Sequence, residues 1–249
     1  TVHVYEQNVS ALEQEEIQEQ RELAETYNAN LVGDELHDPF IQGSGYVIPD
    51  NYNEVLNLSE DGVMGYVDIP KIDVSIPIYH GTSEEILQKG AGHLEASSLP
   101  VGGTDTHSVI SAHRGLPSAK LFTDLDELET GDVFYIHVLD EILAYQVDQI
   151  NTVDPDDLDL LRVVNGRDLV TLLTCTPYAV NTHRLLVRGT RIPYEEAKEV
   201  QEKAETGGNT ISVWLREYFA AIFICVILLI TIILIMKPWR KKKKGKRKR

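Results

Sequence analysis

Short runs of apolar residues, many of them alternating with polar ones, fill the middle of this chain and predict β-strands. The runs are rich in β-branched residues, and turn-forming residues separate them. The predicted strands cover residues 63–69, 75–79, 108–112, 132–138, 142–150, 169–175 and 185–192, with a hairpin turn at 139–141 and short helices at 83–88, 118–128 and 156–161. So many short strands are typical of a β-sandwich or a β-barrel, so we expect a mainly β domain.

The segment before these strands has a helical pattern. Residues 11–30 are rich in Glu and Gln, and their weakly amphipathic spacing predicts a helix that packs on the body as an N-terminal extension. Glycines and prolines predict a loop over 33–50, and a second short helix is predicted at 53–58. The loop contains Asp38-Pro39-Phe40, an acid and an aromatic joined by a stiff proline. We therefore expect residues 1–60 to form a helical extension with a loop, and residues 61–206 to form the β domain.

The end of the chain combines an apolar segment with a basic one. Residues 218–236 are 19 uncharged, mostly apolar residues, and the 13 residues that follow hold ten of the chain's 23 Lys and Arg. A helix of that length is about 28 Å long, close to the thickness of a bilayer's hydrocarbon core, and basic flanks remain on the cytoplasmic side. We expect a charged helix at 193–206, a linker at 207–213, one membrane-spanning helix at 214–236 and a cytoplasmic tail at 237–249. The functional domain then lies outside the cell.

The charge of the chain is divided between its two parts. Residues 1–236 hold 13 Lys and Arg against 39 Asp and Glu, a net charge of −26, whereas the tail carries +10. An acidic domain argues against nucleic acid as a partner, because phosphates demand a basic face. It suits a cationic partner such as a lysine-bearing protein, or it serves solubility alone. The chain opens at Thr1 with no visible leader. Because an external domain needs export, we expect that a leader has been removed.

The chain has two cysteines, which cannot pair with each other. Cys225 lies in the middle of the apolar segment, and Cys175 lies in the predicted external domain. An unpaired thiol is unusual in an oxidising compartment. Such a thiol is either buried and inert or a nucleophile.

Cys175 closes a predicted strand and is followed by Thr176-Pro177, so the strand stops there and the thiol lies at its rim. Arg184 opens the next strand nine residues later. Neighbouring strands lie about 5 Å apart, so these two side chains could stand side by side. A guanidinium there could lower the pKa of the thiol and later hold an oxyanion. The alternative is that Cys175 is a small core residue and Arg184 a surface residue.

A general acid and base is also needed, and two histidines are candidates for it. His113 follows a predicted apolar strand and therefore stands at a strand end. His183 lies directly beside Arg184 and is the local rival. The spacing favours His113 without excluding His183.

Taken together, these motifs resemble the sortases. The resemblance rests on Thr-Leu-Leu-Thr-Cys-Thr-Pro around Cys175, on Arg184 nine residues later, on His113-Arg-Gly-Leu-Pro upstream and on the C-terminal anchor. The stretch from His113 to Asp126 is similar to class C, the pilus-assembling class, as are the anchor and the Asp-Pro-aromatic lid at 38–40. The resemblance covers roughly residues 35–240.

The resemblance implies a closed sortase-type β-barrel of about eight strands, preceded by a lid of Asp38, Pro39 and Phe40. It implies that His113, Cys175 and Arg184 are catalytic. It also implies that the enzyme cleaves Leu-Pro-x-Thr-Gly-type sorting signals between Thr and Gly and transfers the acyl group to a pilin lysine. Its partners would be pilin subunits and the membrane of a Gram-positive cell, with no cofactor and no metal. In the lid, Asp38 would pair with Arg184, and Phe40 would cover Cys175.

Other functions are less well supported by the sequence. The acidic run at 154–159 lacks the spacing of a calcium loop, His107 and His113 lack further zinc ligands nearby, and there is no glycine-rich phosphate loop. A papain-like protease would need a helix behind its cysteine, where this chain has a strand. A housekeeping sortase that uses cell-wall peptide amines and a membrane-anchored adhesin remain as alternatives.

Overall fold

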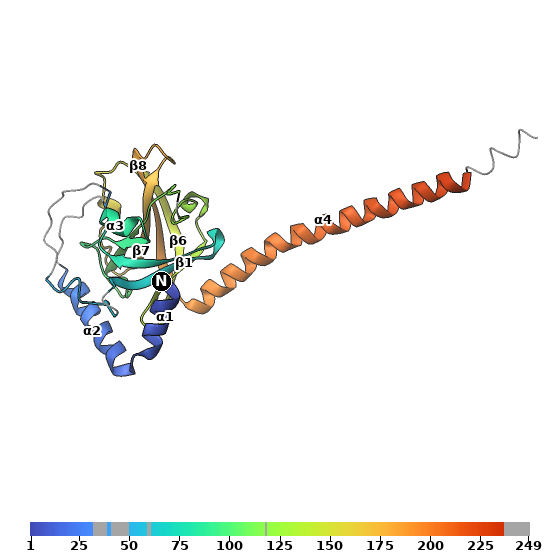
Figure 1. Cartoon of the computed structure of the whole chain (residues 1–249). Coiled ribbons are helices and arrows are strands. Elements are labelled where there is room, and N and C mark those ends of the chain that lie inside the picture. Colours follow the sequence, from blue (N-terminus) through green and yellow to red (C-terminus); the bar gives the residue numbers. More distant parts are fainter. Residues whose placement is uncertain (32–38, 41–49, 59–60, 118, 237–249) are drawn as a thin grey trace, which may run out of the picture. The chain divides into compact units, whose positions relative to one another are not determined.

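The computed structural model describes the chain except for residues 32–38, 41–49, 59–60, 118 and 237–249, and for part of the last helix it describes the backbone only. The chain divides into two compact units, Thr1–Gln201 and Glu202–Arg249 (Figure 1). Every predicted site residue except Asp38 lies in the described part of the first unit.

The first unit is built around a closed β-barrel, which confirms the predicted fold class. Its strands follow the spatial order β1-β2-β3-β4-β7-β8-β6-β5, and β5 pairs with β1 to close it. The pairs β2–β3 and β4–β7 are parallel, and all others are antiparallel. The strands are β1 (Val63–Ile69), β2 (Val74–His80), β3 (Ala91–His93), β4 (Thr106–Ser111), β5 (Val133–Val138), β6 (Glu141–Val153), β7 (Asp168–Thr176) and β8 (His183–Ile192).

Large side chains fill the inside of the barrel. Phe134 and Tyr145 are fully buried and stack with their ring centroids 5.7 Å apart. Their rings cross β8 at Gly189, where an added Cβ would lie 2.6 Å from the Phe134 ring. Only glycine therefore leaves room for this aromatic pair beneath β8.

In the described residues before the barrel there are two helices, α1 (Val2–Ala11) and α2 (Gln14–Asn30). The predicted helix over 11–30 corresponds to α2, which begins later because Glu13 caps it: the Glu13 side chain accepts from the backbone of Glu16, and the Glu16 side chain accepts from the Glu13 N–H at 2.8 Å. Arg21 of α2 pairs with Asp140 and Glu141 at 2.8 and 2.9 Å, at the predicted hairpin turn. These contacts join the extension to the barrel.

The predicted helix at 53–58 is wrong, because the structure has turns there. Leu56 adopts a left-handed φ of 63°, and its N–H bonds to the Gln20 side chain at 2.9 Å in place of a helical carbonyl. The predicted helix at 83–88 is present as α3 (Glu84–Leu87). Of the predicted helices at 118–128 and 156–161, the described residues contain the single 3-10 turns η2 (Leu125–Glu127) and η3 (Asp159–Leu161), and a third, η1 (Pro70–Ile72), follows β1.

The last helix, α4 (Tyr194–Met236), continues through residues 207–213, where the sequence predicts a linker. Its first turns pack on the barrel through Ala197 and Val200. Within the described residues, no helix has the length and apolarity that a membrane crossing requires. The division of this region into linker, span and tail stays a prediction.

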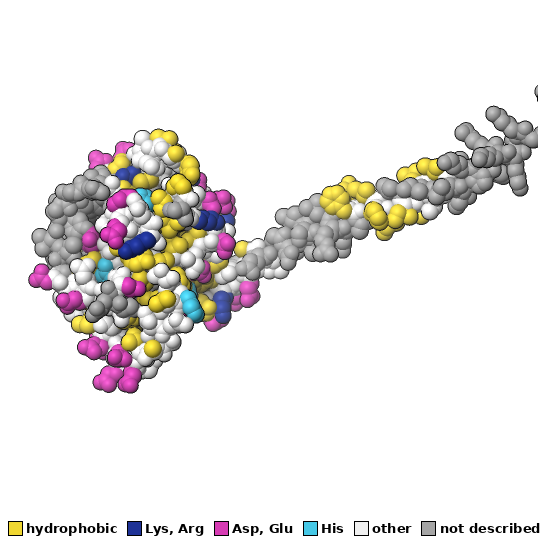
Figure 2. All heavy atoms as spheres, in the orientation of Figure 1, with side chains coloured by type: hydrophobic (Ala, Val, Ile, Leu, Met, Phe, Trp, Pro, Cys, Tyr) yellow, Lys and Arg dark blue, Asp and Glu magenta, His cyan; other side chains and the backbone are white. Residues whose placement is uncertain are grey.

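Acidic side chains are spread over the face of the first unit shown in Figure 2, with basic side chains in smaller groups between them. This distribution agrees with the excess of Asp and Glu in the sequence.

Candidate active site

The predicted thiol and guanidinium lie directly opposite each other on two paired strands. Cys175 of β7 is the cross-strand partner of Arg184 of β8, and both side chains are buried, with 8% and 5% exposed. Opposite residues of an antiparallel pair have their Cβ atoms about 5 Å apart on the same face of the sheet. Strand β7 ends at Thr176, as Pro177 requires, so the pair lies at the rim of the barrel.

His113 reaches the same rim because β4 runs parallel to β7. Ser111 pairs with Leu173, the Ala112 N–H donates to the Leu173 carbonyl at 3.2 Å, and the Thr174 hydroxyl donates to the Ala112 carbonyl at 2.7 Å. Two residues further along this register, His113 stands level with Cys175. The carboxyl ends of two parallel strands thus bring together residues that lie about sixty positions apart in the sequence.

The rival histidine, His183, does not share this arrangement. It pairs with Thr176, one position beyond the Cys175–Arg184 pair, and therefore belongs to the opposite face of the sheet. Its Nε2 lies 3.4 Å from an Asp154 carboxylate oxygen, and its Nδ1 lies 2.9 Å from the Thr182 hydroxyl. The geometry favours His113 as the partner of the thiol.

Phe40 lies between two of these groups. Its ring centroid is 5.7 Å from that of His113, and the Arg184 guanidinium carbon lies 5.2 Å from the Phe40 centroid. The predicted lid thus has its aromatic residue in contact with His113 and Arg184. Asp38 falls outside the described residues, so its pairing with Arg184 stays a prediction, and Pro39 forms a turn with Phe40.

The two polar partners differ in how they are held. The Arg184 Nη1 donates to the carbonyls of Asn181 and His183 at 3.2 and 3.0 Å, which fixes the guanidinium at the start of β8. The His113 Nε2 is shielded from solvent and has no hydrogen bond within the described part of the chain; a Glu84 carboxylate oxygen lies 3.5 Å away. One ring nitrogen is therefore not committed to a structural hydrogen bond.

An apolar patch lies on the same face of the sheet, next to the Cys175–Arg184 pair. We define it by five buried residues: Leu94, Val109, Leu161, Leu173 and Leu186. Phe40, Val153, Leu158 and Leu160 pack against it and are partly buried. The patch places buried apolar side chains next to the thiol, with Phe40 as part of their cover.

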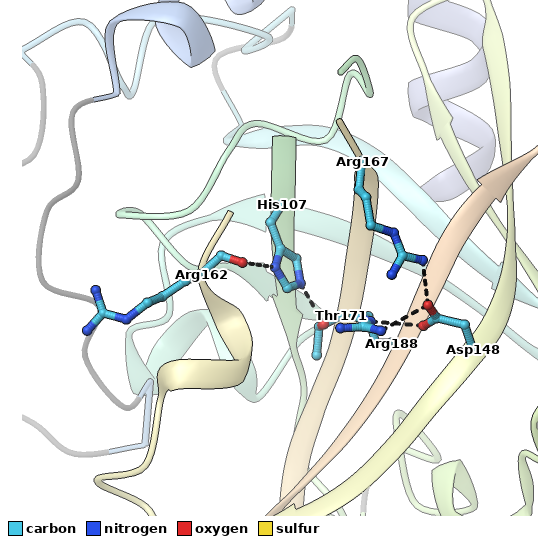
Figure 3. Close-up of polar contacts among 6 residues, drawn as sticks. All are labelled: His107, Asp148, Arg162, Arg167, Thr171 and Arg188. Carbon is cyan, nitrogen blue, oxygen red and sulfur yellow. Dashed lines mark hydrogen bonds and ion pairs between the residues drawn. The ribbon is translucent and has the colours of Figure 1, made fainter. Parts of the chain in front are cut away.

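Further along this face lies a polar network that the sequence reasoning missed (Figure 3). His107 of β4 is buried, with its Nδ1 2.8 Å from the Arg162 carbonyl and its Nε2 2.8 Å from the Thr171 hydroxyl. Burial lowers the pKa of His107 to about 4, so the ring is neutral at physiological pH. The predicted strand began at Ser108 and left His107 out. The only signal in the sequence for His107 was its place beside an apolar strand.

The second half of the network is centred on Asp148, whose carboxylate accepts hydrogen bonds from Arg188 and Arg167. Arg188 contributes two at 2.9 Å, and Arg167 contributes one at 2.7 Å. Partial burial alone would raise the pKa of Asp148, but these bonds outweigh it and lower the pKa. Arg188 is the cross-strand partner of Thr171, so both halves meet on the β7–β8 pair.

Among the described residues, no group of three or more His, Cys, Asp or Glu side chains comes together in a way that could hold a metal ion. Two carboxylates of the acidic run at 154–159 already have partners. Asp154 lies beside His183, and Asp159 lies beside Arg162. The side chains that the strands do bring together at the rim are a thiol, an imidazole and a guanidinium.

Comparisons with known proteins point to one family. A family model described as the Sortase domain matches residues 67–192. Among curated proteins, sortase A of Bacillus anthracis is 28% identical over 60% of this chain and 70% of its own length. Sortase D of Bacillus subtilis is 30% identical over 46% of this chain and 55% of its own length.

Solved structures give a more specific match. A sortase C of Streptococcus pneumoniae, described for its catalysis and pilin substrate specificity, is 52% identical, with a TM-score of 0.71, and the match covers 78% of this chain and 96% of that one. A pilus-related sortase C of Group B Streptococcus is 48% identical, with a TM-score of 0.71, covering 78% and 98%. These matches confirm the resemblance drawn from the motifs.

Proposed function

This chain belongs to the sortase family of cysteine transpeptidases, and we propose that it joins pilin subunits by isopeptide bonds through the trio His113, Cys175 and Arg184. The observation that carries the proposal is the cross-strand pair of Cys175 and Arg184, with His113 level with it on the parallel strand. Its resemblance to sortase C enzymes supports pilin subunits as the substrates.

In the first step, the Cys175 thiolate attacks the carbonyl carbon between Thr and Gly of a Leu-Pro-x-Thr-Gly-type signal. The carbon–sulfur bond forms, the carbon–nitrogen bond breaks, and the glycine amine leaves with a proton from the His113 imidazolium. The product is a thioester, so one difficult substitution is divided into two easier ones. The His113 Nε2 makes no hydrogen bond in the described part of the chain and has only the Glu84 carboxylate at 3.5 Å, which supports this role, because a proton-transfer group needs an available nitrogen.

Arg184 would stabilise the oxyanion that forms during this attack. Its Nη1 is held by two backbone carbonyls, which fixes the guanidinium at the rim beside Cys175, and a guanidinium carries five N–H donors in one plane. A donor fixed before the reaction costs no reorganisation, and one such donor contributes about 3 kcal/mol to the stabilisation of a transition state. Arg184 is also charged at any physiological pH.

In the second step, a lysine amine of the next pilin attacks the thioester carbonyl. The neutral His113 takes a proton from that amine, the amide bond forms, and the carbon–sulfur bond breaks to return the thiolate. Water competes at far higher concentration, so the enzyme must exclude it and place the amine well. Positioning contributes about 7–11 kcal/mol in favourable cases.

The lid would control entry to this site. Phe40 packs against the apolar patch and contacts both His113 and Arg184, so it lies against groups that a substrate would need to reach. We propose that Asp38 pairs with Arg184 in the same resting state. Removal of both side chains from the groove would expose the trio and the patch together.

The location of the enzyme follows from the end of the chain. We propose that residues 214–236 cross the membrane once, that the basic tail at 237–249 is cytoplasmic and that the catalytic domain lies on the outer surface of a Gram-positive cell. Accessibility of the tail and of the catalytic domain to an external protease would test this arrangement. Cleavage of the tail in intact cells would contradict it.

The function is tested by incubating the full chain with a Leu-Pro-x-Thr-Gly peptide and then measuring the mass of the protein. We expect an acyl adduct on Cys175, and no adduct in the Cys175→Ala variant. Two acceptors are then offered, a pilin subunit and an oligoglycine. Ladders of linked pilins support the proposal, whereas coupling to oligoglycine alone indicates a housekeeping sortase.

A further inference from the structure

The loop between β6 and β7, residues 154–167, covers part of the face that carries Cys175. Leu161 is buried in the apolar patch, and Leu158 and Leu160 pack against it. Leu173, at the floor of the patch, is two residues before Cys175 on the same face of β7. Because a strand rises about 3.3 Å per residue, the floor under this loop begins about 7 Å from the Cys175 position.

The middle of this loop is tied to the sheet by His107 (Figure 3). The Arg162 carbonyl, at 2.8 Å from His107 Nδ1, can only accept a hydrogen bond, so Nδ1 carries the proton. The ring is neutral, so Nε2 is an acceptor and the Thr171 hydroxyl donates to it at 2.8 Å. His107 therefore connects β7, at Thr171, to the 154–167 loop, at Arg162.

The end of the loop is fixed by the other half of the network. Arg167 donates to Asp148 at 2.7 Å, and Asp148 is held in turn by Arg188 of β8. This contact sets where the chain re-enters the sheet. The Arg162 carbonyl lies five residues earlier, near the leucines that cover the patch. The His107 bond therefore acts on the part of the loop that packs against the apolar patch.

The length of a sorting signal matches this face. Cys175 and Thr171 are four residues apart on β7, which corresponds to about 13 Å. An extended Leu-Pro-x-Thr segment with its Thr carbonyl at Cys175 spans a similar distance, because extended residues rise about 3.3 Å each. Its leucine would then lie between the sulfur and His107, against the apolar patch and the loop.

We propose that His107 is a positioning residue for the sorting signal: its bond to the Arg162 carbonyl holds the 154–167 loop as one wall of the groove that receives the signal's leucine. This inference rests on the proposed function, since it assumes that the signal binds along β7 from Cys175. His107 does not touch the reacting atoms. Its loss should therefore weaken binding of the signal more than it slows the chemical step.

Two substitutions of His107 distinguish the loss of its hydrogen bond to the Arg162 carbonyl from the loss of the imidazole ring. In His107→Asn, the side-chain N–H₂ can occupy the place of Nδ1 and still donate to the Arg162 carbonyl. In His107→Gln, the amide reaches toward the place of Nε2 and loses that bond. Thr171→Val removes the other hydrogen bond of His107, the one from the Thr171 hydroxyl to Nε2. This variant is the control for the contact between His107 and β7.

The measurement is the steady-state acylation of the full chain by the Leu-Pro-x-Thr-Gly peptide. We expect His107→Gln to raise KM about tenfold, the factor that one ordinary hydrogen bond carries, with kcat within about twofold. His107→Asn should restore KM to within about twofold of the parent value. Equal KM values for the two variants, or a loss confined to kcat, would overturn the proposal.

A second measurement does not depend on the His107 variants being folded. Amide hydrogen exchange of residues 154–167 is followed in Cys175→Ala with and without the peptide, and protection of the loop should rise when the peptide is bound. If the peptide binds and the loop amides exchange at an unchanged rate, the loop is not a wall of the groove. If the parent chain forms no acyl adduct, the proposed function fails instead, and the two failures are told apart.

Discussion

The two ends of the β4–β7–β8 face use polar side chains in opposite ways. At one end, both ring nitrogens of His107 have partners, and both carboxylate oxygens of Asp148 accept hydrogen bonds from arginines. At the other end, the His113 Nε2 is shielded from solvent but has no hydrogen bond within the described residues. The distance between the two ends is only four residues along β7, from Thr171 to Cys175.

This difference separates the stability of the domain from its chemistry. A buried network with complete hydrogen bonding fixes geometry, because breaking any member leaves a costly unpaired group. A group that transfers protons must instead keep a nitrogen available for the substrate. Substitutions at the His107 end should therefore change stability and binding, whereas those at the Cys175 end should change the rate of reaction.

The largest effect is expected for the nucleophile. Cys175→Ala removes the atom that forms the thioester, so acyl transfer should fall more than about a thousandfold. Mass spectrometry after incubation with the peptide measures the adduct. Retention of more than a tenth of the activity would show that Cys175 is not the nucleophile.

Next in size is a matched pair of arginine substitutions on β8. Arg184→Lys loses the planar fork of donors beside the reacting carbonyl, so kcat should fall about a hundredfold. Arg188→Lys loses its paired bonds to Asp148, so the free energy of unfolding should fall by about 1–2 kcal/mol with kcat within about threefold. Kinetics and urea unfolding of both variants measure this contrast. Equal kinetic losses would remove the distinction between the two ends.

Acid should act mainly through the buried histidines. Burial lowers the pKa of His107 to about 4 and that of His93 to about 3, from 6.5 in the unfolded chain. Between pH 6.5 and the lowered pKa values, the unfolded chain binds more protons than the folded chain. The free energy of unfolding should therefore fall as the pH drops below about 6.5. His107→Asn removes one such group and should make the loss between pH 6.5 and 4 smaller by about 3 kcal/mol.

Urea unfolding at a series of pH values measures this effect. His3 has a side chain that is 80% exposed, so His3→Asn serves as the control and should leave the pH profile unchanged. A parent-like profile in His107→Asn would mean that His107 is not held neutral by the fold.

A smaller effect is expected when the Asp148 carboxylate is neutralised. Asp148→Asn leaves Arg167 and Arg188 without their counterion on a partly buried surface, so the free energy of unfolding should fall by about 2 kcal/mol. Asp159 pairs with Arg162 in the open, at 3.1 Å. Asp159→Asn should therefore cost less than about 0.5 kcal/mol. Thermal or urea unfolding measures both, and similar losses would contradict the special role of the network.

The smallest effect concerns the lid. Phe40→Ala, like Asp38→Ala, should raise the rate at which a bulky thiol reagent labels Cys175 by about fivefold, the factor for a contact of about 1 kcal/mol. A small reagent should gain less, because it needs less room. Leu23→Ala, on a helix outside the groove, is the control. Equal labelling rates in the parent and both lid variants would argue against an occluding lid.

Much of the barrel could be predicted because local pattern and fold agree there. All seven predicted strands are present, and the hairpin turn at 139–141 was visible from its polar residues. Strand β3 was missed because it has three residues with a glycine in the middle, and short glycine-containing segments have little β-propensity. The turns at 51–56 depend on tertiary contacts such as the one from Gln20 to Leu56, which no local pattern encodes.

The site was predictable to a different extent for each residue. The neighbourhood of Cys175 and Arg184 follows from a short loop between two strands, which spacing alone can suggest. His113 depends on the parallel pairing of β4 with β7, which is a long-range contact, so spacing alone left His183 open and the family resemblance pointed to His113. The network around His107 depends on Arg162 and Asp148, which reach it from separate parts of the chain, and no sequence motif marks it.

The closure of the barrel has a consequence for how a substrate can be held. Among the described strands, each has a hydrogen-bonded neighbour on both sides. The described strands therefore offer no edge that is free along its whole length, which is what open sheets use to bind extended chains. Recognition falls to the loops and side chains above the sheet, so specificity could be transferred between related enzymes by exchanging loops while the barrel is left intact.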